Sequence, residues 1–510
     1  MVPIEQIIRM MTDDERSGFQ NTLKSMKNQK YLLILFEKLS EPKEWKKNEL
    51  STLVYGKNSK GAYHSLRKRL ARRLIGYISY IRQETDRTEG GSALSMFNTA
   101  QFFMERSGTS EARQYLSKAE TAALNVDQYD TLNMIYNFQL VHHVTLKIEL
   151  GTLIKKLNTN TEAVLQNSKL NIAFAEIQDA HDKMKESGEN LEAETVLNRV
   201  FNDEALMKIA KNNAAFMYRI ASLCRTVIIS AKDYHMFEPY IIGVYDHLKS
   251  QNAFLRHHQK FEIQFEYMIV HALYRTLKFE EAKVWLEKLY KLLPEGRQTS
   301  HELYPKYIST IAAVQTYTGN VHEAIRILND QLSNEKLRIP IKERLNMQLN
   351  LSVYYFSSAN YRDANRAIMK IHHSPAWLDS VMGKEWRFKR DAIEVIIYAE
   401  RGESELALTR IASMKKNYGA FFKNKNYLFA GMFLNFIGQI IQNPAIAETE
   451  EFLSQIKEAA AKGWPGERND IQAITFFCWI KCKIEKRDYY EVLVEVIKAS
   501  ASPAGERRVV

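Results

Sequence analysis

The chain has 510 residues and a formal net charge of +11, with 20 glycines, 10 prolines and three cysteines. Glycine and proline fall below their usual shares of about 7% and 5%, so tight turns and helix breakers are few. Apolar residues recur at spacings of three and four without sustained alternation, which predicts an all-α protein and argues against a β-sheet fold.

Three cysteines in a chain of this size argue against a disulfide framework and fit a reducing compartment. The apolar runs LLILF at 32–36 and ITFFCWI at 474–480 are far shorter than the roughly 20 residues that cross a bilayer. The N-terminal stretch shows no signal peptide. We therefore expect a cytoplasmic protein without a membrane span.

Residues 1–90 are predicted to form a basic helical module. They hold 18 Lys/Arg against 11 Asp/Glu, so most of the net charge lies in less than a fifth of the chain. Two short helices are expected at 31–40 and 48–56, followed by one long helix at 60–82. The long helix carries an apolar stripe made of Tyr63, Leu66, Leu70, Leu74, Tyr77, Ile78 and Ile81.

A glycine turn before a third helix is compatible with helix-turn-helix geometry, and exposed cations could contact phosphates. The candidates for such contacts are Arg67, Lys68, Arg69, Arg72 and Arg73. The alternative is an N-terminal cap with a solvated outer face. The length of the third helix, the lack of a following strand pair and the lack of a cluster of Asn, Gln and Ser residues at its start favour this cap.

Residues 91–262 are predicted to contain enlarged helical hairpins. The stretch 97–124 places Ala100 and Phe103 in one helix and Ala112, Leu116 and Ala119 in the next. Residues 161–186 read as one long helix, and residues 188–229 as one or two more.

Residues 263–500 contain a repeat that can be aligned on alanine. Ala282, Ala324, Ala364 and Ala407 are spaced by 42, 40 and 43 residues. Each is followed four residues later by a large apolar residue, which is Leu286, Leu328, Ile368 or Ile411, and three further on by Leu289, Gln331, Ile371 or Met414. An amphipathic helix precedes each alanine, so the unit is a helical hairpin of about forty residues. A degenerate last copy places Val492, Val496 and Ala499 in the same order.

This pattern resembles the tetratricopeptide (TPR) repeat. Gly319 and Gly402 precede their alanines by five residues, and Pro294 lies where that repeat often ends. The resemblance covers 93–126 and 263–500 and implies a right-handed superhelix of TPR-like hairpins. The composition of residues 501–510 separately predicts a disordered tail. The unit is longer than the usual 34 residues, so another helical-hairpin solenoid remains an alternative.

No sequence motif indicates an enzyme, a cofactor or a metal centre. The Walker, HExxH and GxGxxG patterns are absent. The histidine pairs His142/His143, His257/His258 and His372/His373 point about 100° apart on a helix and do not converge on one ion. Cys478 and Cys482 lack further zinc-spaced partners, so buried apolar roles are expected for the cysteines.

The TPR resemblance implies a concave groove lined by the first helix of each hairpin. The residues that would face it are Gln264, Tyr267, His271, Tyr274, Arg275, Lys306, Ser309, Thr316, Tyr317, Asn346 and Lys389. Aromatic and charged residues suit a surface that binds a peptide. The family's Lys/Asn clamp for a C-terminal carboxylate is not reproduced.

We therefore expect a non-enzymatic scaffold or adaptor that binds a protein or peptide. The alternative is a nucleic-acid-binding transcriptional regulator whose repeats act as a sensor or oligomerise. A structural subunit of a large assembly, which would use the convex face, is a third hypothesis.

Overall fold

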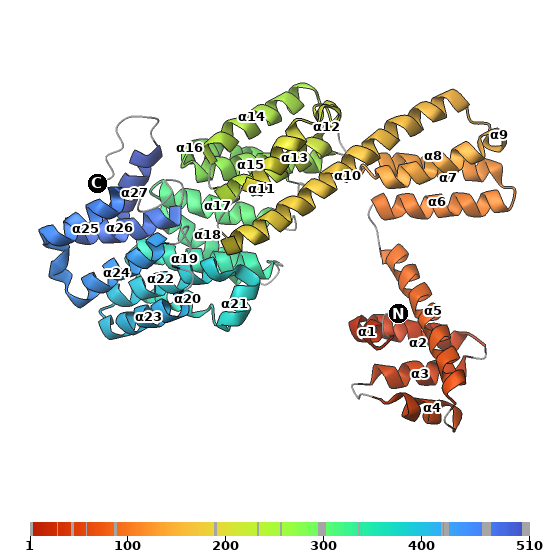
Figure 1. The fold of residues 1–510 in the computed structure, drawn as a ribbon, viewed down its shortest axis with the longest axis horizontal. Coiled ribbons are helices and arrows are strands. Elements are labelled where there is room, and N and C mark those ends of the chain that lie inside the picture. The colour runs from red at the N-terminus through yellow and green to blue at the C-terminus, as the bar shows by residue number, and fades with distance from the viewer. Residues whose placement is uncertain are drawn as a thin grey trace. The chain divides into compact units, whose positions relative to one another are not determined.

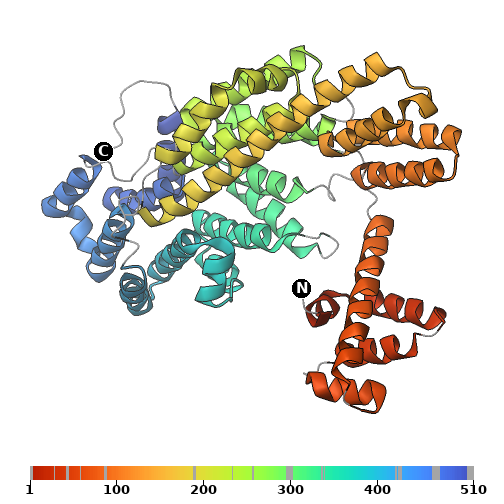
Figure 2. The same cartoon turned by 45° about the vertical axis from the view of Figure 1, so that its right-hand side comes forward.

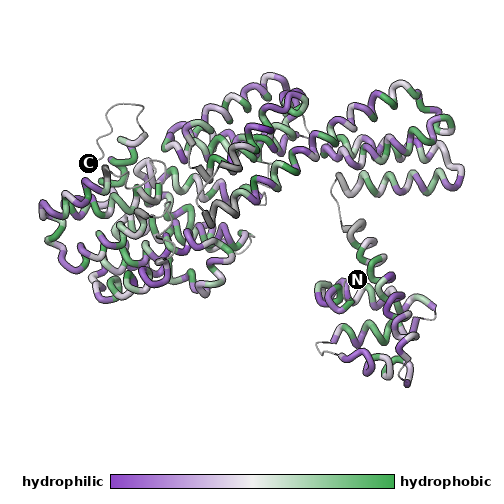
Figure 3. The backbone as a smooth tube through the Cα atoms, viewed as in Figure 1, coloured by the Kyte–Doolittle hydropathy of each residue, from purple (hydrophilic) through white to green (hydrophobic). Residues whose placement is uncertain are grey.

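The computed structural model describes residues 4–27, 29–41, 45–57, 59–85, 89–187, 191–231, 234–254, 258–293, 302–334, 337, 339–419, 422, 428–461 and 471–501. All secondary structure in these residues is helical, which confirms the prediction of an all-α protein (Figure 1). Hydrophobic and hydrophilic segments both occur along each helix (Figure 3). No described helix is long and apolar enough to cross a bilayer. Pro294, His257 and residues 502–510 lie outside the described part of the chain.

The chain divides into two compact units, Met1–Thr161 and Glu162–Val510. The boundary falls inside the range 91–262 that the sequence suggested as one region. Within the first unit, however, two separate hydrophobic clusters form, one from residues between Ile4 and Leu74 and one from residues between Ala93 and Leu153.

The first of these clusters holds together five helices. They are α1 (Ile4–Met10), α2 (Asp13–Ser25), α3 (Lys30–Ser40), α4 (Lys47–Tyr55) and α5 (Lys60–Thr85). Thr12 and Glu15 form a capping box that starts α2. The predicted stripe of α5 is confirmed at Tyr63, Leu66, Leu70 and Leu74, which are buried in the cluster, while Tyr77, Ile78 and Ile81 are half-buried.

The second cluster holds α6 (Glu89–Glu105), α7 (Thr109–Leu124), α8 (Tyr129–Val141), α9 (His143–Leu146) and the start of α10 (Leu150–Ser187). Ala100, Ala112, Leu116 and Ala119 have no exposed surface, as the pattern predicted. The ring of Phe103 stacks on that of Tyr115 at 5.6 Å between centroids.

The second unit begins within α10 and continues with three helices where one or two were expected. These are α11 (Leu191–Phe201), α12 (Glu204–Ala210) and α13 (Ala214–Ala231), followed by α14 (Tyr234–Ser250). The extra breaks have local causes. The Asp203 side chain accepts from the backbone N–H of Leu206, and the Asn213 side chain accepts from Ala215 and Phe216, so each starts a new helix.

Antiparallel hairpins follow in order along the chain. They are α15 (Gln259–Arg275) with α16 (Phe279–Leu292), α17 (Tyr304–Tyr317) with α18 (Val321–Ser333), α19 (Ile341–Ser357) with α20 (Tyr361–Met369), and α22 (Lys384–Glu400) with α23 (Ser404–Asn417). The short helix α21 (Pro375–Met382) precedes α22 and packs against it. In both views these green-to-cyan helices lie side by side (Figures 1 and 2).

The turns of these hairpins share one backbone geometry. Leu277, Gly319, Ala359 and Gly402 have φ between 57° and 100°, each five residues before the repeated alanine. In every case the next residue donates its N–H to the carbonyl five residues back, for example Asn320 to Gln315 at 2.8 Å. Ala282, Ala324, Ala364 and Ala407 have no exposed surface, because the second helix contacts its neighbours there. Ser107 and Ala112 repeat the arrangement in the first unit.

The described chain ends with α24 (Leu428–Gln442), a 3-10 turn η5 (Pro444–Glu448), α25 (Glu450–Ala461), α26 (Ile471–Glu485) and α27 (Tyr489–Ala501). Helices α26 and α27 form a hairpin, which we call the C-terminal hairpin. It contacts α24 through α26 and α17 through α27, so it lies back against earlier helices of the second unit.

Candidate functional site

The first helices of successive hairpins contact one another and form a continuous layer. We call this the first-helix layer, made of α13, α15, α17, α19 and α22. The second helices α14, α16, α18, α20 and α23 pack against it. All the residues that the sequence suggested as groove residues lie on this layer.

A group of cations surrounds a tyrosine on the first-helix layer. We call it the cationic cluster: Arg225 on α13, Tyr267, His271 and Arg275 on α15, and Lys306 on α17. Tyr267, His271 and Arg275 are spaced by four and therefore share one side of α15. Tyr267 is only 8% exposed, whereas the other four side chains are half-buried. The structure thus brings together residues from three helices that are far apart in sequence.

Two cations contact the ring of Tyr267. The guanidinium carbon of Arg225 lies 5.7 Å from the ring centroid, and the Lys306 Nζ lies 5.8 Å from it. Within the described residues, neither cation forms an ion pair with a carboxylate. Burial raises the pKa of the Tyr267 hydroxyl, so this residue stays neutral. Glu343 on α19 is the acidic residue whose charge acts on Tyr267.

His271 is held neutral inside this cluster. Burial is the largest cause that lowers its pKa well below the usual value, and the charges of Arg225, Arg275 and Lys306 lower it further. The cluster is therefore an electropositive site that an incoming anion would neutralise. Because it is half-buried, a bound carboxylate would interact with it more strongly than in bulk water.

Two polar residues flank the cluster. The Tyr218 hydroxyl donates to Gln264 Oε1 at 3.4 Å, and Gln264 Nε2 donates to Glu302 Oε1 at 3.2 Å, so both ends of this amide are engaged. The Oγ atom of Ser309 is buried and has no hydrogen-bond partner among the described residues. Ser309 lies three residues after Lys306 on α17, and its hydroxyl is a buried polar group of this part of the layer.

The other end of α17 is covered by the C-terminal hairpin. Thr316 has no exposed surface and Tyr317 is 7% exposed. The Tyr490 hydroxyl of α27 donates to the Thr316 carbonyl at 2.6 Å. Tyr317 packs against Phe279 and Tyr274, with ring centroids 5.4 and 6.3 Å away. These predicted groove residues form packing contacts here and are closed to a ligand.

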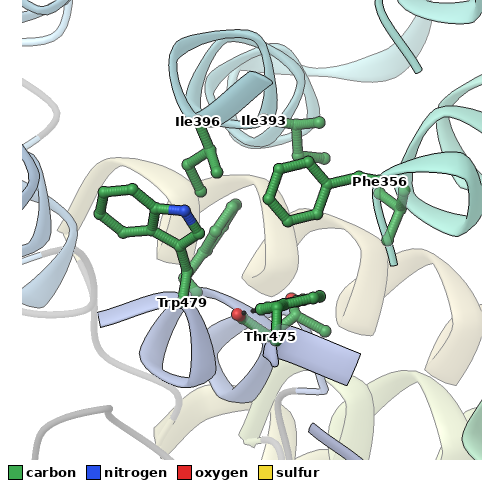
Figure 4. Close-up of a pocket in the computed structure, with 8 residues that line it drawn as sticks. Phe356, Ile393, Ile396, Thr475 and Trp479 are labelled. Atoms are coloured by element: carbon green, nitrogen blue, oxygen red, sulfur yellow. Dashed lines mark hydrogen bonds between the residues drawn. The ribbon is translucent and has the colours of Figure 1, made fainter. Parts of the chain in front are cut away.

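The same hairpin covers α19 and α22. Phe356, Ile393 and Ile396 from those helices face Thr475 and Trp479 of α26 across a small apolar pocket (Figure 4). Trp479 Nε1 donates to Glu400 Oε1 at 2.6 Å, and the Lys483 ammonium pairs with the same carboxylate at 2.5 Å. The chain itself thus occupies this part of the first-helix layer.

Asn346 and Lys389 are tied to neighbours on the first-helix layer. Asn346 Oδ1 accepts from Trp386 Nε1 at 2.9 Å, and Lys389 pairs with Glu385 at 2.6 Å. Of the residues that the sequence suggested for the groove, the structure brings Tyr267, His271, Arg275 and Lys306 into one cluster, and it leaves Asn346 and Lys389 outside it.

The basic candidates on α5 behave in two ways. Arg67 makes a bidentate contact with Glu5 of α1 at 2.5 and 3.1 Å, which lowers the pKa of Glu5 and fixes the two helices together. Lys68, Arg69, Arg72 and Arg73 are exposed. Arg67 is therefore a structural residue of the module, and the other four form its outer surface.

Sequence reasoning missed Arg225 and a network of buried charges. Arg225 lies on α13, in the region where the repeat pattern is weakest. It follows Tyr218 by seven residues, about two helical turns, so the sequence does indicate that these two side chains lie on the same side of an apolar helix. On α22, Asp391 accepts from Arg390, Arg410 and the Tyr418 hydroxyl at 2.7–2.9 Å, and Glu394 binds the same two arginines. Charged residues at helical spacing look like a solvated face in the sequence, so nothing local marks this network as buried.

No group of three metal-binding side chains occurs in the described ranges. Cys224, Cys478 and Cys482 are free and buried, as predicted, and burial raises the pKa of Cys224 and of Cys482 to about 12. Such thiols are not reactive nucleophiles at neutral pH.

No protein-family model matches the chain, and no curated protein matches it significantly.

Proposed function

We propose that this protein is a TPR-like helical-repeat scaffold or adaptor that binds an acidic segment of a partner protein at the cationic cluster. Four hairpins with a shared left-handed turn and a buried alanine at one register support the repeat. A right-handed superhelix of these hairpins and a cytoplasmic location belong to the same proposal.

The contact of the half-buried Arg225 and Lys306 with the buried ring of Tyr267 carries this function. Arg225 and Lys306 are half-buried and have no carboxylate partner in the described chain, which favours an anionic ligand. The C-terminal hairpin closes the other end of the layer, so binding is expected on α13, α15 and the first half of α17.

Selection of binders from a random peptide library against the full-length protein tests the proposal. Bound peptides should slow hydrogen exchange in α15 and α17, and selected sequences should be rich in Asp and Glu. Arg225→Gln with Lys306→Gln should weaken their binding about tenfold. Lys288→Gln is the matched control, because Lys288 lies 4.0 Å from the centroid of Trp285 but on the second helix α16.

Peptides that protect only other helices, or that bind both variants equally, would contradict the proposed function. Neutral peptides that protect α15 and α17 would leave the scaffold role standing and overturn the acidic ligand.

A further inference from the structure

The outer face of α5 carries cations that the module itself does not use. Within the part of the chain that the structure describes, Lys68, Arg69, Arg72 and Arg73 take part in no ion pair and no side-chain hydrogen bond. Arg67, their neighbour, is held by Glu5 and by the Tyr63 hydroxyl at 3.4 Å. Of the five basic residues between positions 67 and 73, the fold therefore uses one in a contact and leaves four on the surface.

The four cations form a compact array. Lys68 and Arg72 are four residues apart, as are Arg69 and Arg73, so they make two rows on the helix. At 1.5 Å per residue the array extends about 7.5 Å along α5. Lys60 and His64 are also exposed and continue the row of Lys68 and Arg72 toward the start of the helix. Such regularly placed charges match a ligand whose own charges repeat along a chain.

The module presents this face rigidly. The opposite side of α5 is buried through Leu66, Leu70 and Leu74, which have no exposed surface. The turn into α5 is fixed by Gly56, whose φ is 72°, and by a hydrogen bond from the Ser59 N–H to Ser51 Oγ at 2.9 Å. The Tyr55 hydroxyl also donates to the Ala62 carbonyl at 3.2 Å. The array is therefore carried on a folded scaffold, in the order helix α4, turn, helix α5.

We infer that the outer face of α5 binds the phosphate backbone of a nucleic acid, without reading its sequence. Phosphate contacts by Lys and Arg supply most non-specific affinity, and four such residues suffice for strongly salt-dependent binding. The start of α5 lacks the Asn, Gln and Arg set that reads base edges, so no sequence preference is expected. This role goes beyond peptide binding at the cationic cluster and does not depend on it.

Two other polyanionic partners fit the face less well. A helix that lies on a membrane needs its apolar side free for insertion, and that side of α5 is already buried in the module. An acidic protein segment would gain most from half-buried cations such as those of the cationic cluster, whereas the four cations of α5 lie exposed on an open helix face.

The test is a fluorescence-anisotropy titration of the full-length protein with a random-sequence DNA duplex and a single-stranded RNA over a range of salt concentrations. Arg69→Gln, Arg72→Gln and Arg73→Gln together should lower the affinity at low salt at least tenfold. They should also reduce the slope of log K against log salt by about 2–3, because each lost duplex phosphate contact contributes about 0.9.

The matched control removes the same charge from another exposed part of the module. Lys24→Gln, Lys27→Gln and Lys30→Gln should change the affinity less than about twofold, since these residues lie at the end of α2 and the start of α3. Arg225→Gln with Lys306→Gln should also leave nucleic-acid binding unchanged. Circular dichroism on each variant checks that the module stays folded.

Three results would overturn the inference. They are no binding of either nucleic acid at low salt, an equal loss in the control triple variant, and tighter binding to phosphatidylserine vesicles or to polyglutamate than to nucleic acid.

Discussion

On α5, Lys68, Arg69, Arg72 and Arg73 stand in solvent, whereas on the first-helix layer Arg225 and Lys306 are half-buried against one tyrosine. On α22, the carboxylates of Asp391 and Glu394 are buried and are paired with Arg390 of the same helix and Arg410 of α23. The side chains are of the same types, but their hydration differs. Because desolvation decides what a charge contributes, the three sites should respond differently to mutation, salt and pH.

The buried network should give the largest effect. Asp391→Ala leaves Arg390 and Arg410 with less negative charge in a buried site and removes the hydrogen bond from Tyr418. We expect the free energy of unfolding to fall by about 3–5 kcal/mol in urea denaturation. A loss below about 1 kcal/mol would mean that the buried charges contribute no more to the free energy of unfolding than exposed charges do.

Glu266 is a buried carboxylate that has no cation in contact among the described residues, so it tests how burial alone affects stability. It is 3% exposed, its Oε1 accepts from the Tyr245 hydroxyl at 2.9 Å, and burial raises its pKa to about 7. The folded protein then holds a proton that the unfolded chain releases near pH 4.5, so stability falls as the pH rises from about 4.5 to 7.

Glu266→Gln removes this dependence. The variant should be about 2 kcal/mol more stable than the parent at pH 8 and nearly equal to it at pH 4.5, measured by thermal and urea unfolding. Glu262→Gln is the comparison, because Glu262 is also buried but has Lys249 as an ion-pair partner, and its replacement should destabilise. Equal effects at both pH values would contradict the pKa assigned to Glu266.

In the cationic cluster, His271 should determine how stability changes with pH. Burial and three cations lower its pKa, so the folded state disfavours the charged ring and loses stability as the pH falls below about 6.5. Arg225→Gln with Lys306→Gln should raise the pKa of His271 toward its usual value and weaken that acid sensitivity. The pKa can be followed by NMR of the imidazole, and an unchanged pKa would show that these cations do not act on His271.

The exposed face should give the smallest effect on stability. Arg69→Gln, Arg72→Gln and Arg73→Gln together should change the free energy of unfolding by less than about 0.5 kcal/mol. Arg67→Gln is the sharper contrast, because it breaks the contact with Glu5 and should cost about 1 kcal/mol. If the triple change destabilised more than Arg67→Gln, the outer face would have a structural role.

Much of the local structure follows from sequence patterns alone. The register of Ala282, Ala324, Ala364 and Ala407 predicted four second helices and their buried side, and each alanine is fully buried. The stripe of Leu66, Leu70 and Leu74 predicted which side of α5 is buried. The helix count between 188 and 229 was too low, because caps at Asp203 and Asn213 depend on a few local hydrogen bonds that periodicity does not detect.

The candidate site was only partly predictable. Tyr267, His271 and Lys306 were found because they lie on the side of the first helices that the repeat frame predicts to face the groove, but Arg225 lies in a region without a clear repeat. Thr316 and Tyr317 lie on the same predicted side, yet the C-terminal hairpin covers them through contacts such as Tyr490 to Thr316, 174 residues apart. A repeat pattern describes neighbouring hairpins and contains no information about contacts between segments that are far apart in the sequence.

The sequence by itself determined the helical class, the hairpin register and the apolar side of helices such as α5 and those that carry the repeated alanines, because these depend on spacings of three and four within short segments. Only the tertiary structure decided which charges are hydrated, which tyrosine ring the cations contact and which part of the first-helix layer remains open. Those properties depend on how tightly distant segments exclude water, and a charged side chain has the same sequence signature whether it is solvated on α5 or buried on α22.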